Sequence, residues 1–328
     1  MPLTLDLSVA DLASTRFAIS PLSETISGLQ QLGDPRLQET NLRWMRWASD
    51  ELAARPLGLS RTWPLIVNDR PHWPQFLLPA PIGAGRTIDD DLAAMRRTTA
   101  RQVRDSLQRV FGDDLPDGAV ELAAHPAAEL RAIATELREA HDRLIAPYWS
   151  RIRAVLDADI AYRAKQLAAG GAARLFADLH PDLRWHDGRL TLQRWRSDRI
   201  MNPAPGGLVL LPVVLGTAYV LIKGNTTTHT TVRYPARGVG ALWTAGTRPA
   251  SGSAVRLLGR PRAELLEALR SPATTTDLAR ALKVSPSAVS QHLSVLRDSG
   301  LVVGERTGRS VLYLTTERGL ALLDPKPR

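Results

Sequence analysis

Small hydrogen-bonding side chains crowd one face of a short predicted helix near the end of the chain. Its apolar residues recur at i, i+4 and i+7 spacing and should face a core. The side chains off that stripe carry hydroxyl, amide and guanidinium groups, which can hydrogen-bond to base edges on the floor of the DNA major groove. The apolar stripe is Val289, Leu293 and Leu296, and the polar set is Ser287, Ser290, Gln291, Ser294 and Arg297.

The elements around this helix are predicted by capping and turn signals. Ser285-Pro286 is an N-cap followed by proline at the first helical position. A shorter helix over 277–282 precedes it, with Thr276 as its cap. Two such helices joined by a tight turn are compatible with an ordinary αα-hairpin that has a polar outer face.

The residues that follow favour a more specific structure. Gly300 should end the helix, residues 301–303 and 311–314 are typical of strands, and residues 305–309 between them should form a turn. Two helices followed by a hairpin with arginines at its tip constitute a winged helix-turn-helix.

The run SAVSQHLSVLRDSGLV followed by GRSVLYLT resembles the recognition helix and wing of the ArsR family of bacterial transcriptional repressors, over about residues 256–322. The resemblance implies a homodimer that binds double-stranded DNA at an inverted repeat, and repression by default. At the matching positions it implies base reading by Ser287, Ser290 and Gln291. We expect phosphate or minor-groove contacts from Ser285, Arg306, Thr307 and Arg309.

Metal sensing, the activity for which this family is best known, is not expected. The chain has no cysteine, and residues 274–278, where family members place thiols, read TTTDL. The seven histidines form no H-x-x-x-H pair, and no nucleotide-binding or nucleophile-elbow motif is present. We therefore expect no metal, no cofactor and no catalytic residues, while His292 should pack against the neighbouring helix rather than touch phosphate.

The larger, N-terminal part of the chain is predicted to be an α+β domain over residues 1–250, ahead of a DNA-binding domain over 251–328. Helices come first, including one continuous helix from Thr87 to about Phe111 and a long helical stretch from Pro126 that Gly170-Gly171 closes. From residue 183 the period changes to two, with a hairpin around Asp187-Gly188. We expect an antiparallel meander, joined by a strand at residues 3–7. The domain order resembles that of some actinobacterial ArsR-like regulators with large uncharacterised extensions.

All eight tryptophans precede the predicted DNA-binding domain. They could line a pocket for an apolar effector, but burial in a core is the commoner role of tryptophan. Since a winged helix needs only ~70–100 residues, the remainder should serve effector sensing or dimerisation.

Charge and hydropathy place further bounds on the chain. The net charge is +9, and residues 255–328 hold 12 lysines and arginines against 7 acids, which fits a nucleic-acid contact. The start of the chain lacks a basic signal-peptide region. Residues 200–222 carry no charge, but prolines and glycines favour short buried strands there over a membrane helix. We expect a cytoplasmic regulator with a non-metal signal. The alternative is a metabolite-binding or enzyme-like domain with an appended DNA-binding module.

Overall fold

The computed structural model describes residues 2–33, 41–68, 70, 73–81, 85–193, 199–216, 219–223, 229–244, 252–269, 273–307 and 310–323. The chain divides into two compact units, one of residues 1–37 and 51–237 and the other of residues 38–50 and 238–328. This division differs from the predicted boundary at residue 250, because α10 (Val239–Thr244) packs on a helix of the second unit, α13 (Thr275–Leu282). The division also runs through α3 (Leu42–Ala54).

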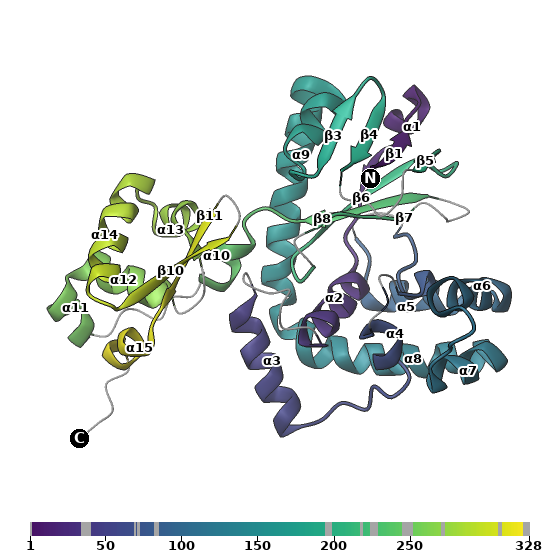
Figure 1. Cartoon of the computed structure of the whole chain (residues 1–328), viewed down its shortest axis with the longest axis horizontal. Coiled ribbons are helices and arrows are strands. Elements are labelled where there is room, and N and C mark those ends of the chain that lie inside the picture. Colours follow the sequence, from purple (N-terminus) through teal and green to yellow (C-terminus); the bar gives the residue numbers. More distant parts are fainter. Residues whose placement is uncertain are drawn as a thin grey trace. The chain divides into compact units, whose positions relative to one another are not determined.

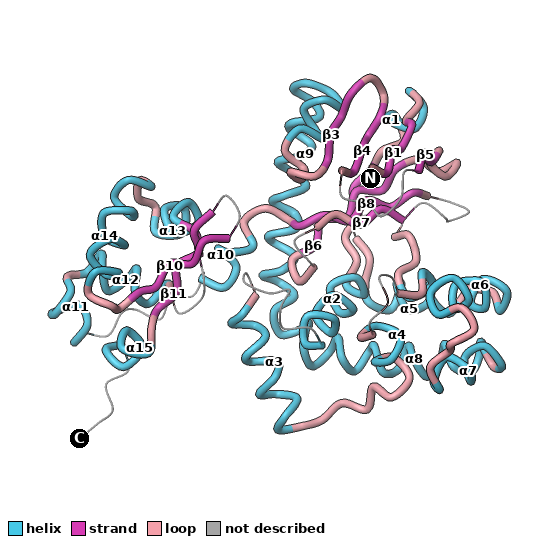
Figure 2. Tube along the Cα trace, in the orientation of Figure 1, coloured by secondary structure: helices cyan, strands magenta, loops and turns pink. Residues whose placement is uncertain are grey.

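The first unit contains two four-stranded sheets (Figures 1 and 2). In the first sheet, in the order β3-β4-β1-β5, β1 pairs antiparallel with β4 and parallel with β5. The predicted hairpin is confirmed, with Asp187 and Gly188 at φ values of 46° and 77° in its two-residue turn. The strands are β1 (Leu3–Asp6), β3 (Leu183–His186), β4 (Arg189–Leu192) and β5 (Arg199–Met201).

The second sheet has the order β2-β6-β8-β7 and is mixed. Its central strands β6 and β8 run parallel, whereas β7 is antiparallel to β8. The α+β class is confirmed, but the single antiparallel meander is wrong, because β6 is an apolar run buried on both faces, as in parallel sheets. The strands are β2 (Arg16–Phe17), β6 (Leu208–Val213), β7 (Leu221–Lys223) and β8 (Thr230–Pro235).

Both sheets contribute to one apolar core, which the C-terminal part of α9 (Trp149–Ala177) also joins. Val232 and Tyr234 of β8 point into this core and are fully buried. Phe176 of α9 stacks at 5.2 Å from Trp185, a half-buried tryptophan at the core's edge. Of the tryptophans whose side chains are described, Trp44 alone is almost fully buried, so the expectation that tryptophans are core residues holds for only some of them.

Helices make up the rest of the first unit. Thr99 breaks the helix predicted over 87–111 into two, because its hydroxyl and Gln102 form a capping box that starts a new helix. Gly170 and Gly171 do not close the helical region but kink α9, which continues to Ala177. The helices are α1 (Val9–Ala13), α2 (Pro21–Gly33), α4 (Trp63–Ile66), η2 (Gln75–Leu77), α5 (Ile88–Arg96), α6 (Ala100–Phe111), α7 (Asp117–Ala124), α8 (Pro126–Ala140), η3 (His141–Ile145) and η4 (Ala146–Tyr148).

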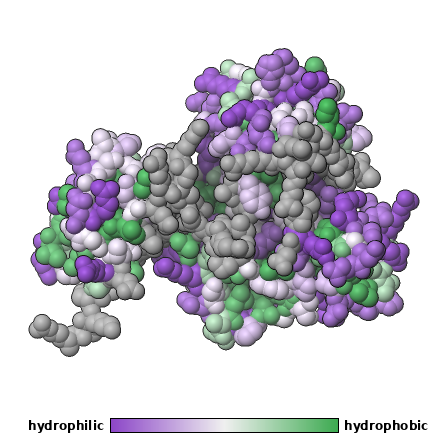
Figure 3. Space-filling model, viewed as in Figure 1, coloured by the Kyte–Doolittle hydropathy of each residue, from purple (hydrophilic) through white to green (hydrophobic). Residues whose placement is uncertain are grey.

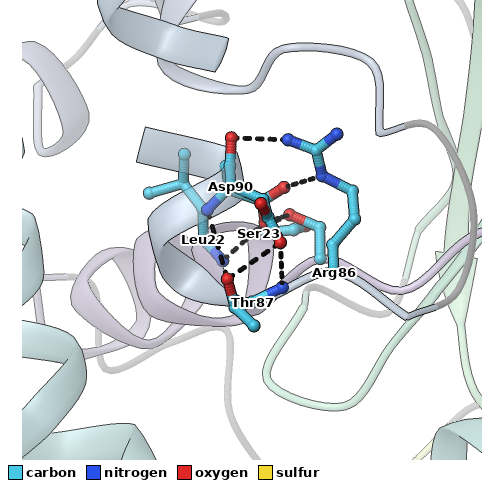
Figure 4. A network of polar contacts seen from close by, with 7 residues as sticks. Leu22, Ser23, Arg86, Thr87 and Asp90 are labelled. Carbon is cyan, nitrogen blue, oxygen red and sulfur yellow. Dashed lines mark hydrogen bonds and ion pairs between the residues drawn. The ribbon is translucent and has the colours of Figure 1, made fainter. Parts of the chain in front are cut away.

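A buried carboxylate fixes the start of α2, and Figure 4 labels two of its partners, Leu22 and Arg86. Asp91 of α5 accepts hydrogen bonds from the Ser20 hydroxyl at 2.7 Å and from the Leu22 N–H at 3.3 Å. Arg86 donates to the other oxygen of Asp91 at 2.8 Å. These bonds hold α2 in one position among α4, α5 and α8, against which it packs.

Within the described part of the charge-free stretch 200–222, the regular elements are strands, β6 and β7 among them. None of the helices in the described part of the chain is both long and apolar enough to cross a membrane.

The second unit is a helical cluster with a three-stranded sheet in the order β10-β11-β9. Its core draws on every helix from α11 to α15 and on the sheet, with Leu266, Leu278 and Val289 fully buried. The remaining elements are α11 (Gly252–Leu258), α12 (Arg260–Ala268), β9 (Ala273–Thr274), α14 (Pro286–Asp298), β10 (Val302–Thr307), β11 (Ser310–Thr315) and α15 (Glu317–Leu323).

Candidate nucleic-acid interface

A tight turn joins α13 to α14. Lys283 adopts a left-handed conformation with φ of 55°, unusual for a residue other than glycine. The Val284 N–H returns to the Ala279 carbonyl at 3.0 Å, which closes the end of α13. One residue later the Ser285 hydroxyl caps α14 by accepting from the Ala288 N–H at 3.2 Å. The predicted Ser285-Pro286 start of this helix is confirmed.

The apolar stripe of α14 lies in the core of the unit. Val289 is 0%, Leu293 1% and Leu296 1% exposed. This stripe packs α14 against α12 and α13, so the orientation of the helix about its own axis is fixed. The opposite face must therefore point to solvent.

That opposite face carries the predicted base-reading residues. Ser287, Ser290 and Gln291 are all exposed, and Ser294 and Arg297 extend the face by another turn. The Ser285 and Ser287 hydroxyls lie 3.0 Å apart at the start of the helix. His292 is half-buried at the border between the two faces. The structure thus brings Ser285, Ser287, Ser290 and Gln291 to one exposed surface, which we call the α14 face.

The wing follows directly. Gly300, at φ of 68°, ends α14, and its N–H donates to the Arg297 carbonyl at 2.8 Å. Strands β10 and β11 then pair antiparallel from Val302↔Thr315 to Thr307↔Ser310. Residues 305–307, predicted as part of a turn, instead continue the strand, because backbone pairing runs on to the tip of the hairpin.

Not every predicted wing residue falls in the described structure. Arg306 and Thr307 lie at the tip end of β10, but their side chains are outside the described residues, and so is the whole of Arg309. Their contacts with DNA stay a prediction.

Two elements that the sequence analysis did not predict hold the wing in place. Strand β9 pairs with β11 through Thr274 and Ala273. Helix α15 follows β11 and packs against it. Thr315, where β11 ends, donates through its N–H to the Leu269 carbonyl at 2.9 Å and through its hydroxyl to the Leu266 carbonyl at 2.8 Å. The wing is therefore tied to the end of α12 as well as to its own hairpin.

Within the described residues, no group of three or more histidines and carboxylates is arranged to hold a metal ion. The α14 face offers hydroxyl and amide groups, and Arg297 adds a guanidinium further along the helix. These groups can hydrogen-bond to a polar surface.

A helix-turn-helix with a buried stripe, an exposed polar recognition face and a wing defines the winged-helix class of DNA-binding domains. Residues 261–303 match the family described as bacterial regulatory protein, arsR family. Residues 95–240 match a family of unknown function, DUF5937. The chain carries a C-terminal helix-turn-helix domain of the ArsR family, behind an N-terminal region of the DUF5937 family.

Curated relatives agree with the C-terminal match. The HTH-type transcriptional regulator NmtR of Mycobacterium tuberculosis is 45% identical over 73 residues, which are 22% of this chain and 61% of that protein. The HTH-type transcriptional repressor SmtB of the same species is 40% identical over 74 residues, or 22% of this chain and 55% of SmtB. The chain thus spans little more than half the length of the relatives it matches.

One solved structure is also similar, that of a possible transcriptional regulator for arsenical resistance. It is 36% identical, and the match covers 22% of this chain and 76% of that one with a TM-score of 0.20.

Proposed function

We propose that this protein is a transcriptional regulator that binds a specific DNA sequence as a homodimer and represses the genes beside it. Each α14 enters the major groove at one half of an inverted repeat. Ser287, Ser290 and Gln291 read base edges, while Ser285 and the wing residues Arg306, Thr307 and Arg309 contact phosphates or the minor groove. The observation that carries this proposal is the α14 face, polar and exposed above a fully buried apolar stripe.

The positive charge of the C-terminal region supports the same proposal. Residues 255–328 hold most of the chain's excess of basic residues. Basic side chains displace counterions from DNA and so supply affinity that is independent of sequence. Specificity is then left to the α14 face.

An apolar groove in the second unit supports dimerisation. Ser253, Arg256 and Leu257 of α11 line it together with Ala321 and Leu322 of α15. Leu257 is 68% exposed, and apolar surface is visible over α11 in Figure 3. An exposed apolar strip of this kind suits the same strip on a second copy across a two-fold axis. Leu257→Glu should shift the chain to a monomer in size-exclusion chromatography with light scattering.

The N-terminal unit receives the signal in this proposal. This unit is larger than the DNA-binding unit, and it has a separate apolar core and separate sheets. A small molecule bound there would alter the affinity of the dimer for its operator. An enzyme-like N-terminal unit is the alternative reading, and it predicts substrate turnover by the full chain.

The direct test is an electrophoretic shift of the DNA upstream of the chain's own gene. We expect a discrete complex that survives an excess of unrelated competitor DNA. A complex that unrelated DNA displaces as readily as promoter DNA would contradict the proposal.

A further inference from the structure

Three polar side chains share one face of the second sheet. Lys223 of β7 pairs in register with Thr231 of β8, and Arg233 lies two residues further along β8. Because side chains alternate along a strand, all three point away from the core that holds Val232 and Tyr234. We call Lys223, Thr231 and Arg233 the cationic face.

Helix α2 covers this face. Arg233 donates a hydrogen bond to the Ser27 hydroxyl, and Gln31 donates to the Gly216 carbonyl at 3.1 Å. Glu24, one turn before Ser27, accepts hydrogen bonds from the N–H groups of Val214 and Leu215 at 2.7 Å each. The polar residues of α2 therefore lie against the end of β6 and against the cationic face.

The guanidinium of Arg233 is buried without an ion pair. Arg233 is 6% exposed, and its Nε has no hydrogen-bond partner. Among the described residues, Arg233 forms no ion pair, and both oxygens of Glu24, the carboxylate whose charge acts on it, accept hydrogen bonds from backbone N–H groups. Burial lowers the pKa of Arg233 to about 10, although the charge of Glu24 opposes that shift.

Lys223 is a second cation on this face, and it is half-buried. Its ammonium donates to the backbone carbonyls of Gln75 and Leu78 but to no described carboxylate. Burial, and then the charge of Arg109, lowers the pKa of Lys223 to about 7. The hydroxyl of Thr231, which is 7% exposed, has no hydrogen-bond partner either.

A buried guanidinium, a half-buried ammonium and an unpaired hydroxyl carry an energetic cost that a bound anion relieves. Burying a charge is unfavourable unless it is paired, and the fork of a guanidinium matches a carboxylate or phosphate. The Arg233 guanidinium also lies over the indole ring of Trp73, 5.8 Å from the ring centroid. This ring forms an aromatic side of the site. Trp73 and Lys223 are only half-buried, so the group is not sealed from solvent.

We propose that the cationic face binds a small organic anion, held through its carboxylate or phosphate by Arg233, Lys223 and the Thr231 hydroxyl. This inference rests on the proposed function, since it identifies the site and the chemical class of the signal that the N-terminal unit receives.

Strand β8 connects this site to the chain leading into the DNA-binding unit. Next to Arg233, the Tyr234 hydroxyl donates to Asp159 at 2.8 Å. The other oxygen of Asp159 accepts from the Arg237 N–H at 3.1 Å. Arg237 is the last residue of the first unit. An anion that shifts β8 thus acts on the residue directly before the second unit.

The test measures anion binding by the full chain in the absence of DNA. Acetate, benzoate, succinate and phosphate are titrated by calorimetry at constant ionic strength made up with chloride. We expect saturable binding of at least one of them. Binding of a carboxylate alone identifies an organic acid as the ligand class, and binding of phosphate alone identifies a phosphorylated metabolite.

Variants then locate the site. Arg233→Gln and Lys223→Gln should each weaken anion binding at least tenfold. Exposed residues of the same types provide matched controls, Arg101→Gln on α6 and Lys165→Gln on α9, and these should bind as the wild type does. Circular dichroism checks that both variants fold. If Arg233→Gln does not fold, Lys223→Gln still tests the site, because a half-buried side chain is more easily replaced.

The inference is overturned if none of the four anions binds, or if both site variants bind as tightly as their controls. Promoter binding is also measured in the absence of any anion. This second measurement distinguishes failure of the anion site from failure of the proposed DNA-binding function. A chain that shifts promoter DNA but binds no anion contradicts the inference alone. A chain that binds the anion but no specific DNA contradicts the proposed function.

Discussion

Lys283, in the turn of the helix-turn-helix, has a backbone conformation that is unfavourable for a residue with a side chain. Its φ of 55° lies in the left-handed region, which costs a residue with a side chain about 1–2 kcal/mol. Lys283→Gly should remove that cost. Against this gain stands the larger entropy that glycine loses on folding, which destabilises by ~0.5–1 kcal/mol. We expect the second unit to gain up to about 1 kcal/mol, measured by differential scanning calorimetry. Lys283→Val should destabilise it, and a more stable valine variant would show that the turn is not held as described.

Lys223 should make the stability of the first unit depend on pH. Its pKa of about 7 in the folded chain lies below the ordinary value of 10.5, chiefly through burial and secondarily through Arg109. Between these values the unfolded state binds more protons, so stability rises with pH. Below pH 7 the ammonium is charged in both states and its burial cost is fully present.

We therefore expect the melting temperature of the full chain to rise from pH 7 to pH 9 relative to Lys223→Met, by the equivalent of about 1 kcal/mol. The exposed Lys165→Met serves as the control and should follow the wild type. Parallel curves for the wild type and Lys223→Met would mean that Lys223 titrates normally.

At the scale of elements, the wing depends on how closely α15 docks. A Cβ added at Gly319 would lie 2.5 Å from the Leu301 carbonyl oxygen and 2.5 Å from Cγ2 of Thr315. Gly319→Ala should therefore lower the free energy of unfolding by about 1–3 kcal/mol. It should also weaken DNA binding, because the wing is displaced. Gly252→Ala in α11 is a matched control, because nothing lies within 4 Å of its added Cβ. Calorimetry that finds both variants equally stable would argue against close docking of α15.

The wing should supply affinity without specificity. Arg309→Ala should weaken binding to every DNA sequence and reduce the slope of log affinity against log salt by about one. Fluorescence anisotropy at several salt concentrations measures both quantities, with Arg101→Ala as the control. An unchanged affinity and slope would remove Arg309 from the interface.

Elements defined by local signals could be predicted from the sequence, whereas those defined by distant partners could not. The cap at Ser285, the end of α14 at Gly300 and the turn at Asp187-Gly188 each depend on a few neighbouring residues. The parallel pairing of β6 with β8 depends on residues some twenty positions apart, which alternation in the sequence does not specify.

Two features carried a signal that the sequence analysis did not use. Thr99 and Gln102 have capping-box spacing, which marks a helix start inside the segment predicted as one helix. Arg233 lies on the face of β8 that α2 covers and is buried there, yet a charged residue in a strand is ordinarily taken to face solvent. The exposure of Ser287, Ser290 and Gln291 followed from the apolar periodicity of α14, which indicates the side of the helix that is buried, while their contacts with DNA stay a prediction.

At the scale of the whole molecule, the chain joins a recognition unit with no cysteine to a larger unit with a buried cationic face. The order of the elements places β8 and Arg237 directly before the DNA-binding unit in the chain. A signal bound in the first unit therefore has a short covalent route to the second. We propose that the signal is an anion bound in the first unit, since the chain has no cysteine to supply a thiolate metal ligand.

The most direct test of the central claim, that the α14 face reads DNA, compares Gln291→Ala with the wild type on promoter and unrelated DNA. Anisotropy should show that the variant loses about 1–3 kcal/mol of its preference for promoter DNA, while its binding to unrelated DNA is unchanged. Gln108→Ala, an exposed glutamine on α6, is the matched control and should keep the full preference. If Gln291→Ala discriminates between the two DNAs as well as the wild type and the control do, Gln291 does not read the operator and the α14 face is not the recognition surface.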